Sequence, residues 1–122
     1  MVQKYIKGDI VMYDNKIHTI MDTLELNNYE LSYIEHPVHQ LELSGVPLTL
    51  EILEKNGWKD DGYDWYRLPT KRAYLYITKD ITTLDEFLVC VGLDRHNLAS
   101  INFVHQLQHL LFGLNINSEM EV

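Results

Sequence analysis

Short runs of alternating apolar and polar residues fill the first 45 positions of the chain. Residues 10–12 and 17–21 alternate on either side of Asp14-Asn15, a pair that tolerates the positive φ of a two-residue hairpin turn. A second alternating run covers residues 29–33. Several short strands with turns this close together are typical of a small curled sheet. The pattern predicts an antiparallel, SH3-like β unit over residues 1–45.

The middle of the chain predicts a short helix followed by an antiparallel sheet of about three strands. Thr49 suits a helix N-cap and Gly57 a helix end, so a helix of about two turns is expected between them. The strands are expected where apolar residues alternate with polar ones or form a continuous run. These segments are 58–60, which turns into 63–68, then 73–78 and 87–91. Residues 80–86 predict a loop or a single helical turn.

The last predicted element is a longer, amphipathic helix. Ser100 can cap a helix running from Ile101 to Phe112, and Gly113 would end it. Apolar residues recur along it at spacings of three and four, which gives a wide stripe facing a core. The opposite face carries polar side chains, namely Asn102, His105, Gln106 and His109.

Together these elements predict an α+β fold. A β-rich subdomain over 1–45 precedes an α+β subdomain over 46–122, and the two are expected to pack as one compact unit. The chain has 122 residues, of which 46% are hydrophobic and 23% charged. This composition fits a folded globular chain and argues against wholesale disorder.

Charge and cysteine content exclude several classes of protein. The net charge of -8 lacks the basic excess on which non-specific nucleic-acid binding depends. The single cysteine, Cys90, lies in an apolar run and can form neither an internal disulfide nor a cysteine-based zinc site. The first ten residues lack the apolar segment of a signal peptide, and no apolar run is long enough to span a membrane. A cytoplasmic location is expected.

Three segments of the chain resemble one known family. Residues 104–114, Val-His-Gln-Leu-Gln-His-Leu-Leu-Phe-Gly-Leu, with the block 47–58 and the opening 8–13, are similar to uncharacterised short proteins of gut anaerobes, their prophages and other mobile elements. Those proteins end in a helix close to VHQLQNLYFALTG. This chain differs at His109 and Leu111, where the family usually has Asn and Tyr. The resemblance implies a mobile-element accessory protein and implies no particular chemistry.

The polar face of the last helix is the first candidate site. His105 and His109 are four residues apart, a spacing that can chelate zinc or nickel. A zinc protease would need Glu after the first His, and Gln106 there cannot act as a general base. With Asn102, these side chains form an amide- and imidazole-rich face that favours binding a protein partner. A metal-dependent enzyme that uses His105 and His109 is the alternative.

The only basic cluster, on the predicted turn at Arg67, Lys71 and Arg72, is the second candidate site. Cations beside aromatic rings are typical of sites for single-stranded nucleic acid. A nucleic-acid-associated module that uses this turn is therefore an alternative function, although the acidic charge of the chain opposes it.

Aromatic residues are dense between positions 58 and 76. Strand alternation places Tyr63 with Trp65 on one face, and Tyr74 with Tyr76 together. Most of these rings are expected in the core, but rings that face outward would mark a protein-interaction surface.

The chain contains no nucleotide-binding loop, hydrolase elbow or catalytic cysteine signature. The sequence therefore predicts a non-catalytic interaction protein without a cofactor. Its expected partner is another protein or a second copy of the chain, rather than nucleic acid or a membrane.

Overall fold

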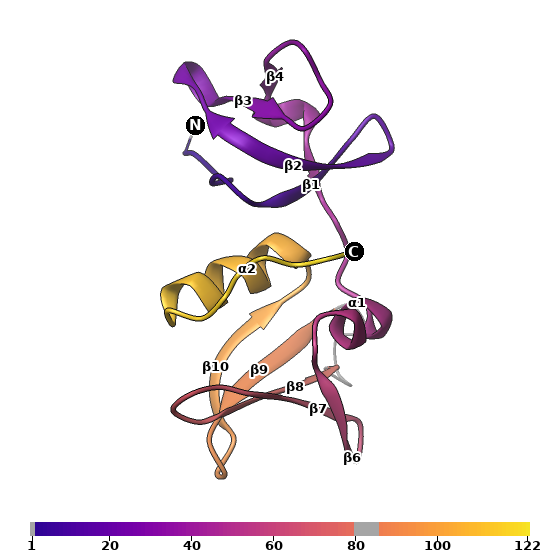
Figure 1. Cartoon of the computed structure of the whole chain (residues 1–122), viewed down its shortest axis with the longest axis vertical. Helices are drawn as coiled ribbons and strands as arrows, with labels where there is room; N and C mark the ends of the chain where they lie inside the picture. Colours follow the sequence, from indigo (N-terminus) through magenta and orange to yellow (C-terminus); the bar gives the residue numbers. More distant parts are fainter. Residues whose placement is uncertain (1, 80–85) are drawn as a thin grey trace.

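The computed structural model describes residues 2–79 and 86–122, and in that part the protein is mostly β (Figure 1). It contains two five-stranded antiparallel sheets, which we call the N-terminal and the C-terminal sheet. Their strands fall on either side of the expected boundary at residue 45. The predicted loop or turn at residues 80–86 lies outside the described residues except for Glu86.

The N-terminal sheet has the strand order β4-β3-β2-β1-β5. Its first hairpin turns at Asp14 and Asn15, whose φ angles of 50° and 61° are the positive values that the sequence predicted there. Short 3-10 helices η1 (Glu25–Asn27) and η2 (Gln40–Glu42) precede β3 and β5. The strands are β1 (Ile10–Tyr13), β2 (Lys16–Thr23), β3 (Asn28–Leu31), β4 (Val38–His39) and β5 (Ser44–Gly45).

The C-terminal sheet has the strand order β10-β9-β8-β7-β6, so each strand pairs with its neighbour in the sequence. The strands are β6 (Lys59–Gly62), β7 (Trp65–Pro69), β8 (Tyr74–Lys79), β9 (Phe87–Val91) and β10 (His96–Ile101). In the described part of the chain, α2 (Val104–Gly113) is the one helix longer than two turns. The other helix, α1 (Leu50–Lys55), has six residues; the Thr49 hydroxyl caps it, and Gly57 follows with a φ of 88°.

The prediction of an α+β fold with a C-terminal sheet of about three strands is therefore wrong. The sequence analysis missed β10, because His96–Ile101 has few apolar residues and only Ile101 is buried. That strand lies at the edge of the sheet and pairs with β9 through a β-bulge near Leu98, which interrupts the alternation. Ser100 lies in β10 and does not cap the helix, which starts three residues later than predicted, at Val104.

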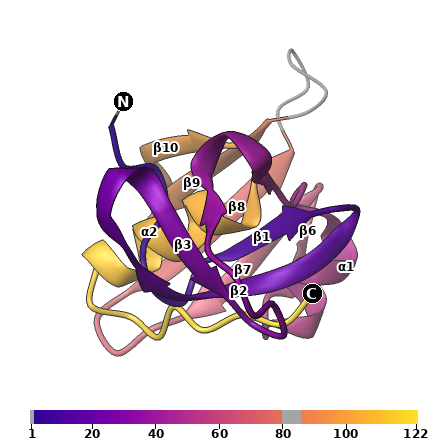
Figure 2. The ribbon, with the colours of Figure 1, turned by 90° about the horizontal axis from the view of Figure 1, so that it is seen from above.

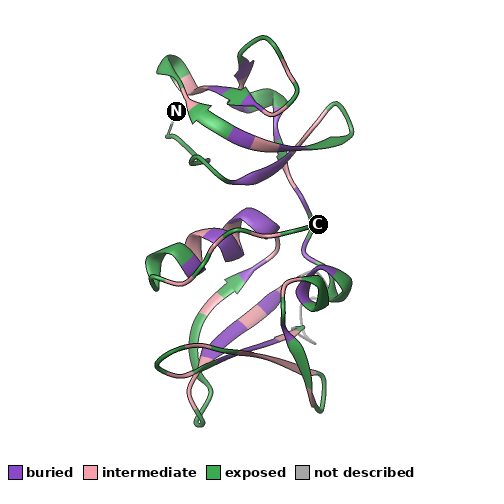
Figure 3. Ribbon diagram, viewed as in Figure 1, coloured by how far each residue is buried: buried purple, intermediate pink, exposed green. Residues whose placement is uncertain are grey.

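Helix α2 lies between the two sheets (Figure 1), and in the view from above it overlaps strands of both (Figure 2). Its apolar stripe, including Val104, Leu107 and Leu111, packs with the C-terminal sheet in the larger of two hydrophobic clusters. Strand β1 contributes to both clusters, because Ile10 belongs to the larger one and Val11 to the cluster of the N-terminal sheet. Buried residues accordingly continue from β1 through α2 to β8 and β9 (Figure 3).

Candidate functional site

The polar face of α2 contacts the segment that leads into β1. The Gln108 side chain is buried, and its Oε1 accepts a hydrogen bond from the backbone N–H of Ile10 at 2.9 Å. Its Nε2 donates to the carbonyl oxygens of Gly8 at 3.0 Å and Ser118 at 3.2 Å. One amide therefore joins the C-terminal helix to the first strand and to the tail that follows the helix.

Asp9 and His109 form a second connection between the same two segments. The Asp9 carboxylate is only 2% exposed, and its Oδ2 lies 2.6 Å from Nε2 of His109 and accepts from the backbone N–H of Ile6 at 2.9 Å. Burial raises the pKa of Asp9, because the ionised form loses water, while the bonds from Ile6 and His109 act in the opposite direction. The pair stabilises the contact between α2 and the N-terminal sheet.

His105 lies in the interior beside this pair. Its ring centroid is 5.0 Å from that of Tyr5 and 5.8 Å from that of Phe103, on which it stacks. Within the part of the chain that the structure describes, neither its buried Nδ1 nor the buried Tyr5 hydroxyl has a hydrogen-bond partner. Burial, with smaller contributions from His109 and Lys4, lowers the pKa of His105 to about 4, so the imidazole is neutral at pH 7.

The other two residues of the predicted partner face serve the start of the helix. The Gln106 Oε1 accepts from the backbone N–H groups of Asn102 and Phe103 at 2.7 and 3.0 Å, so this side chain caps α2. The face that the sequence analysis placed opposite the core is thus largely an internal contact. Asn102, Gln106 and His109 remain partly exposed, and a role for them in partner binding stays a prediction.

The metal alternative can be compared with the geometry of the two histidines. Their rings lie 5.7 Å apart, edge to face, and Nε2 of His109 is engaged by Asp9. In the described ranges 2–79 and 86–122, no group of three or more His, Cys, Asp or Glu side chains could hold a metal ion. A metal-dependent role for His105 and His109 stays a prediction.

The three basic residues of the second candidate site have different environments. Arg67 lies on β7, where its guanidinium is 3.5 Å from Asp61 and 4.9 Å from the ring centroid of Tyr74. Lys71 and Arg72 lie in the exposed turn between β7 and β8. Arg67 is therefore paired within the sheet, whereas the two cations with which the sequence analysis grouped it lie in the turn.

Arg67 belongs to a cluster on the face of the C-terminal sheet that points away from the core. Leu75 and Ile77 of β8 are buried in the larger cluster, so alternation directs Tyr74 and Tyr76 to the opposite face. Trp65 lies on the same face, with its ring edge-on to that of Tyr76 at 6.4 Å. We call this cluster the aromatic–arginine face, and its members are Asp61, Trp65, Arg67, Tyr74, Tyr76 and Arg95.

Two guanidinium groups cover the rings of this face. Arg95 lies 4.6 Å from the ring centroid of Trp65 and 4.9 Å from that of Tyr76, and it also contacts Asp61 at 3.3 Å. Tyr76 is buried under this layer, whereas Tyr74 is 42% exposed and each arginine side chain 40% exposed. Tyr74 and the two guanidinium groups are therefore held in place while still open to solvent.

The sequence analysis identified the aromatic residues of this face but missed Arg95 and Asp61. Arg95 lies in the turn between β9 and β10, and because β10 was not predicted, nothing placed that turn beside Trp65. Asp61 was interpreted as a turn residue, whereas it lies in β6, next to the strand that carries Arg67. The alternation of β7 and β8 was the only available signal for the face.

Comparison with known proteins adds no further constraint. No family model, no curated protein and no solved structure matches the chain. The SH3-like assignment of residues 1–45 and the likeness to mobile-element proteins therefore stay predictions. Among the described residues, no helix has both the length and the apolar character needed to cross a bilayer.

Proposed function

We propose that this protein is a non-catalytic interaction protein that binds a protein partner through the aromatic–arginine face. The observation that carries the proposal is the layer formed by Arg67 and Arg95 over Trp65, Tyr74 and Tyr76. Trp, Tyr and Arg are the residue types that contribute most to the free energy of protein binding, and they do so when they are clustered.

The rigidity of the face supports the same function. Asp61 contacts both guanidinium groups, and these in turn lie over the rings, so few rotamers remain to be fixed when a partner binds. Side chains that are ordered beforehand lose less conformational entropy on association, which favours affinity.

The charge of the face indicates the chemistry of the partner. Two guanidinium groups share one carboxylate, so the face carries an excess positive charge on a chain whose net charge is -8. A carboxylate on the partner could pair with an arginine in a planar, bidentate manner while an apolar group contacts Tyr74. The resemblance to mobile-element proteins favours a host or phage protein as the source of that surface.

The test is an affinity capture from a gut-anaerobe lysate, with and without nuclease, followed by mass spectrometry. The variant Tyr74→Ser/Arg95→Gln removes an exposed ring and a cation from the face. The matched control Tyr33→Ser/Lys16→Gln removes an aromatic ring and a cation from exposed positions of the N-terminal part, where Tyr33 is 97% exposed. Circular dichroism establishes that both variants fold.

We expect the wild type and the control to capture one protein in equal molar amount, and this capture should persist after nuclease treatment. The Tyr74→Ser/Arg95→Gln variant should not capture that protein. Equal capture by all three proteins would show that the face is not the interface. Capture that disappears with nuclease would instead support the nucleic-acid module, and Arg67, Lys71 and Arg72 would then be the residues to change.

A further inference from the structure

A groove runs between the β7–β8 turn and the segment that follows α2. Its larger part has a volume of about 840 Å³ and lies between residues 69–73 and 114–117, over Leu75 and Val91. A smaller hollow of about 210 Å³ continues it toward Trp58 and shares Pro69, Ile116 and Asn117 with the larger part. We call the two together the tail groove; it contains no residue of the aromatic–arginine face.

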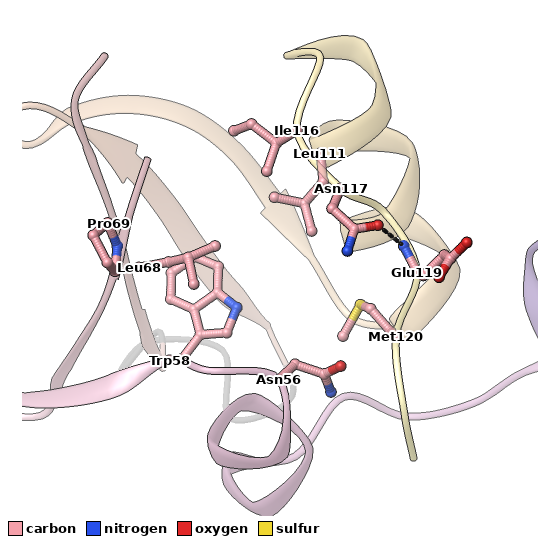
Figure 4. Close-up of a pocket in the computed structure, with 9 residues that line it drawn as sticks. All are labelled: Asn56, Trp58, Leu68, Pro69, Leu111, Ile116, Asn117, Glu119 and Met120. Carbon is pink, nitrogen blue, oxygen red and sulfur yellow. Dashed lines mark hydrogen bonds between the residues drawn. The ribbon is translucent and has the colours of Figure 1, made fainter. Parts of the chain in front are cut away.

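The inner end of the tail groove is lined mainly by apolar side chains, together with Asn56, Asn117 and Glu119. Figure 4 shows Trp58 and Leu68 on one side of the hollow, with Leu111 and Ile116 opposite and Met120 beside them. Trp58 and Leu111 belong to the larger hydrophobic cluster, so this end is a recess in the core surface. A volume of several hundred Å³ whose walls combine apolar side chains with a few polar groups is typical of sites for small organic molecules.

The outer end of the groove is cationic. Lys71 and Arg72 line the larger part and are exposed. Within residues 2–79 and 86–122, neither side chain forms an ion pair or a hydrogen bond, whereas Arg67 and Arg95 are both paired with Asp61. Among the described residues, no carboxylate lines the larger part of the groove, although the chain has a net charge of -8; Glu119 lines the smaller hollow. Two unpaired cations at the mouth of an apolar recess favour an anionic group.

From this arrangement we infer that the tail groove binds a single-chain carboxylate amphiphile, such as a medium-chain fatty acid. The carboxylate pairs with Lys71 and Arg72 at the outer end. The aliphatic chain runs past Ile116 toward Trp58 and Leu68, where it is removed from water. The shape of the ligand follows from the groove, because one end is charged and the connected end is apolar.

The experiment measures binding of decanoate, below its micelle concentration, by calorimetry and by tryptophan emission. The chain has two tryptophans, so in a Trp65→Phe background Trp58 alone reports on the inner end of the groove. Decylammonium has the same aliphatic chain with the opposite charge and serves as the control ligand. Inorganic phosphate, as an anion without a chain, is the second control.

We expect saturable binding of one decanoate per chain, with a change in Trp58 emission and no saturable binding of either control ligand. The variant Lys71→Gln/Arg72→Gln should bind decanoate at least tenfold more weakly. The control Lys7→Gln/Lys16→Gln changes the net charge equally at two exposed lysines outside the groove and should bind like the wild type.

Four results would overturn the inference. They are the absence of saturable decanoate binding, equal binding of decylammonium, unchanged affinity in the Lys71→Gln/Arg72→Gln variant, and binding of inorganic phosphate in place of decanoate.

Discussion

Replacement of Gln108 by Leu tests whether the contact between α2 and the N-terminal sheet stabilises the fold. Leu has a similar size and keeps the helix, but it removes the three hydrogen bonds that the amide makes. The backbone N–H of Ile10 is then buried without an acceptor, since this residue is only 5% exposed. The carbonyl oxygens of Gly8 and Ser118 lie nearer to solvent and can bond to water.

The expected loss in the free energy of unfolding can be calculated for each hydrogen bond in turn. A buried donor left without a partner costs about 1–3 kcal/mol, and two bonds exchanged for water cost about 0.5–1 kcal/mol each. Leu recovers part of this by burying apolar surface, so the net loss is about 2–3 kcal/mol. With an unfolding entropy of about 2.1 cal/mol/K per residue, this lowers Tm by about 10 °C.

The assay is urea unfolding followed by circular dichroism, with Tm from calorimetry. The control is Gln3→Leu, because Gln3 is exposed and makes one hydrogen bond, to the carbonyl oxygen of Tyr5 at 2.9 Å. Gln3→Leu should change the free energy of unfolding by less than about 0.5 kcal/mol. A loss below about 1 kcal/mol for Gln108→Leu would refute the reasoning, since the amide would then contribute no more than a surface group.

Three other outcomes follow from described contacts. Folding lowers the pKa of His105 from 6.5 to about 4, so between these two pH values the unfolded chain binds a proton at His105 and the folded chain does not. The free energy of unfolding therefore falls by up to about 3 kcal/mol as the pH drops from about 6.5 to 4. His105→Phe should remove that part of the pH dependence in urea titrations, and an unchanged profile would contradict the burial argument. Gly45→Ala should lower the free energy of unfolding by about 1–3 kcal/mol, because the new Cβ would lie 2.6 Å from Cγ of Phe103. In Gly113→Ala the new Cβ meets no atom within 4 Å, so this control substitution should leave the free energy of unfolding unchanged or raise it. The Cys90 thiol is buried, which raises its pKa, and it donates a hydrogen bond to Oδ1 of Asn97 at 3.2 Å. A thiol reagent should therefore modify Cys90 at least a hundredfold more slowly in the native protein than in the urea-unfolded protein. Comparable rates of modification would contradict this prediction.

Local sequence signals predicted the turns and the shorter elements well. The Asp14-Asn15 hairpin, the helix between Thr49 and Gly57 and the strand at 87–91 are all present, because each depends on neighbouring residues alone. The strand His96–Ile101 was missed because it pairs at a sheet edge and buries little. The fold class was therefore wrong even though most of its parts were recognised.

The candidate sites depended on contacts that no local pattern encodes. The spacing of His105 and His109 correctly indicates that both leave one side of the helix, but it does not show that Asp9, a hundred residues earlier, pairs with His109. In the same way, Arg95 reaches Trp65 only through the antiparallel order of β7 to β10. Long-range partners decide whether a polar face meets solvent or another part of the same chain.

The contact between α2 and β1 joins residues that are far apart in the sequence, which has a consequence during synthesis of the chain. Ile10 and Gln108 are 98 residues apart, so at about 5–20 residues per second the ribosome releases β1 some 5–20 s before the amide that it binds. Throughout this interval the nascent N-terminal sheet exposes Ile10, and Asp9 has no histidine beside it. Every C-terminally truncated chain that lacks α2 presents the same apolar strand, which is the kind of surface that chaperones and proteases recognise. The contact with α2 therefore covers this apolar strand only after the helix has been synthesised.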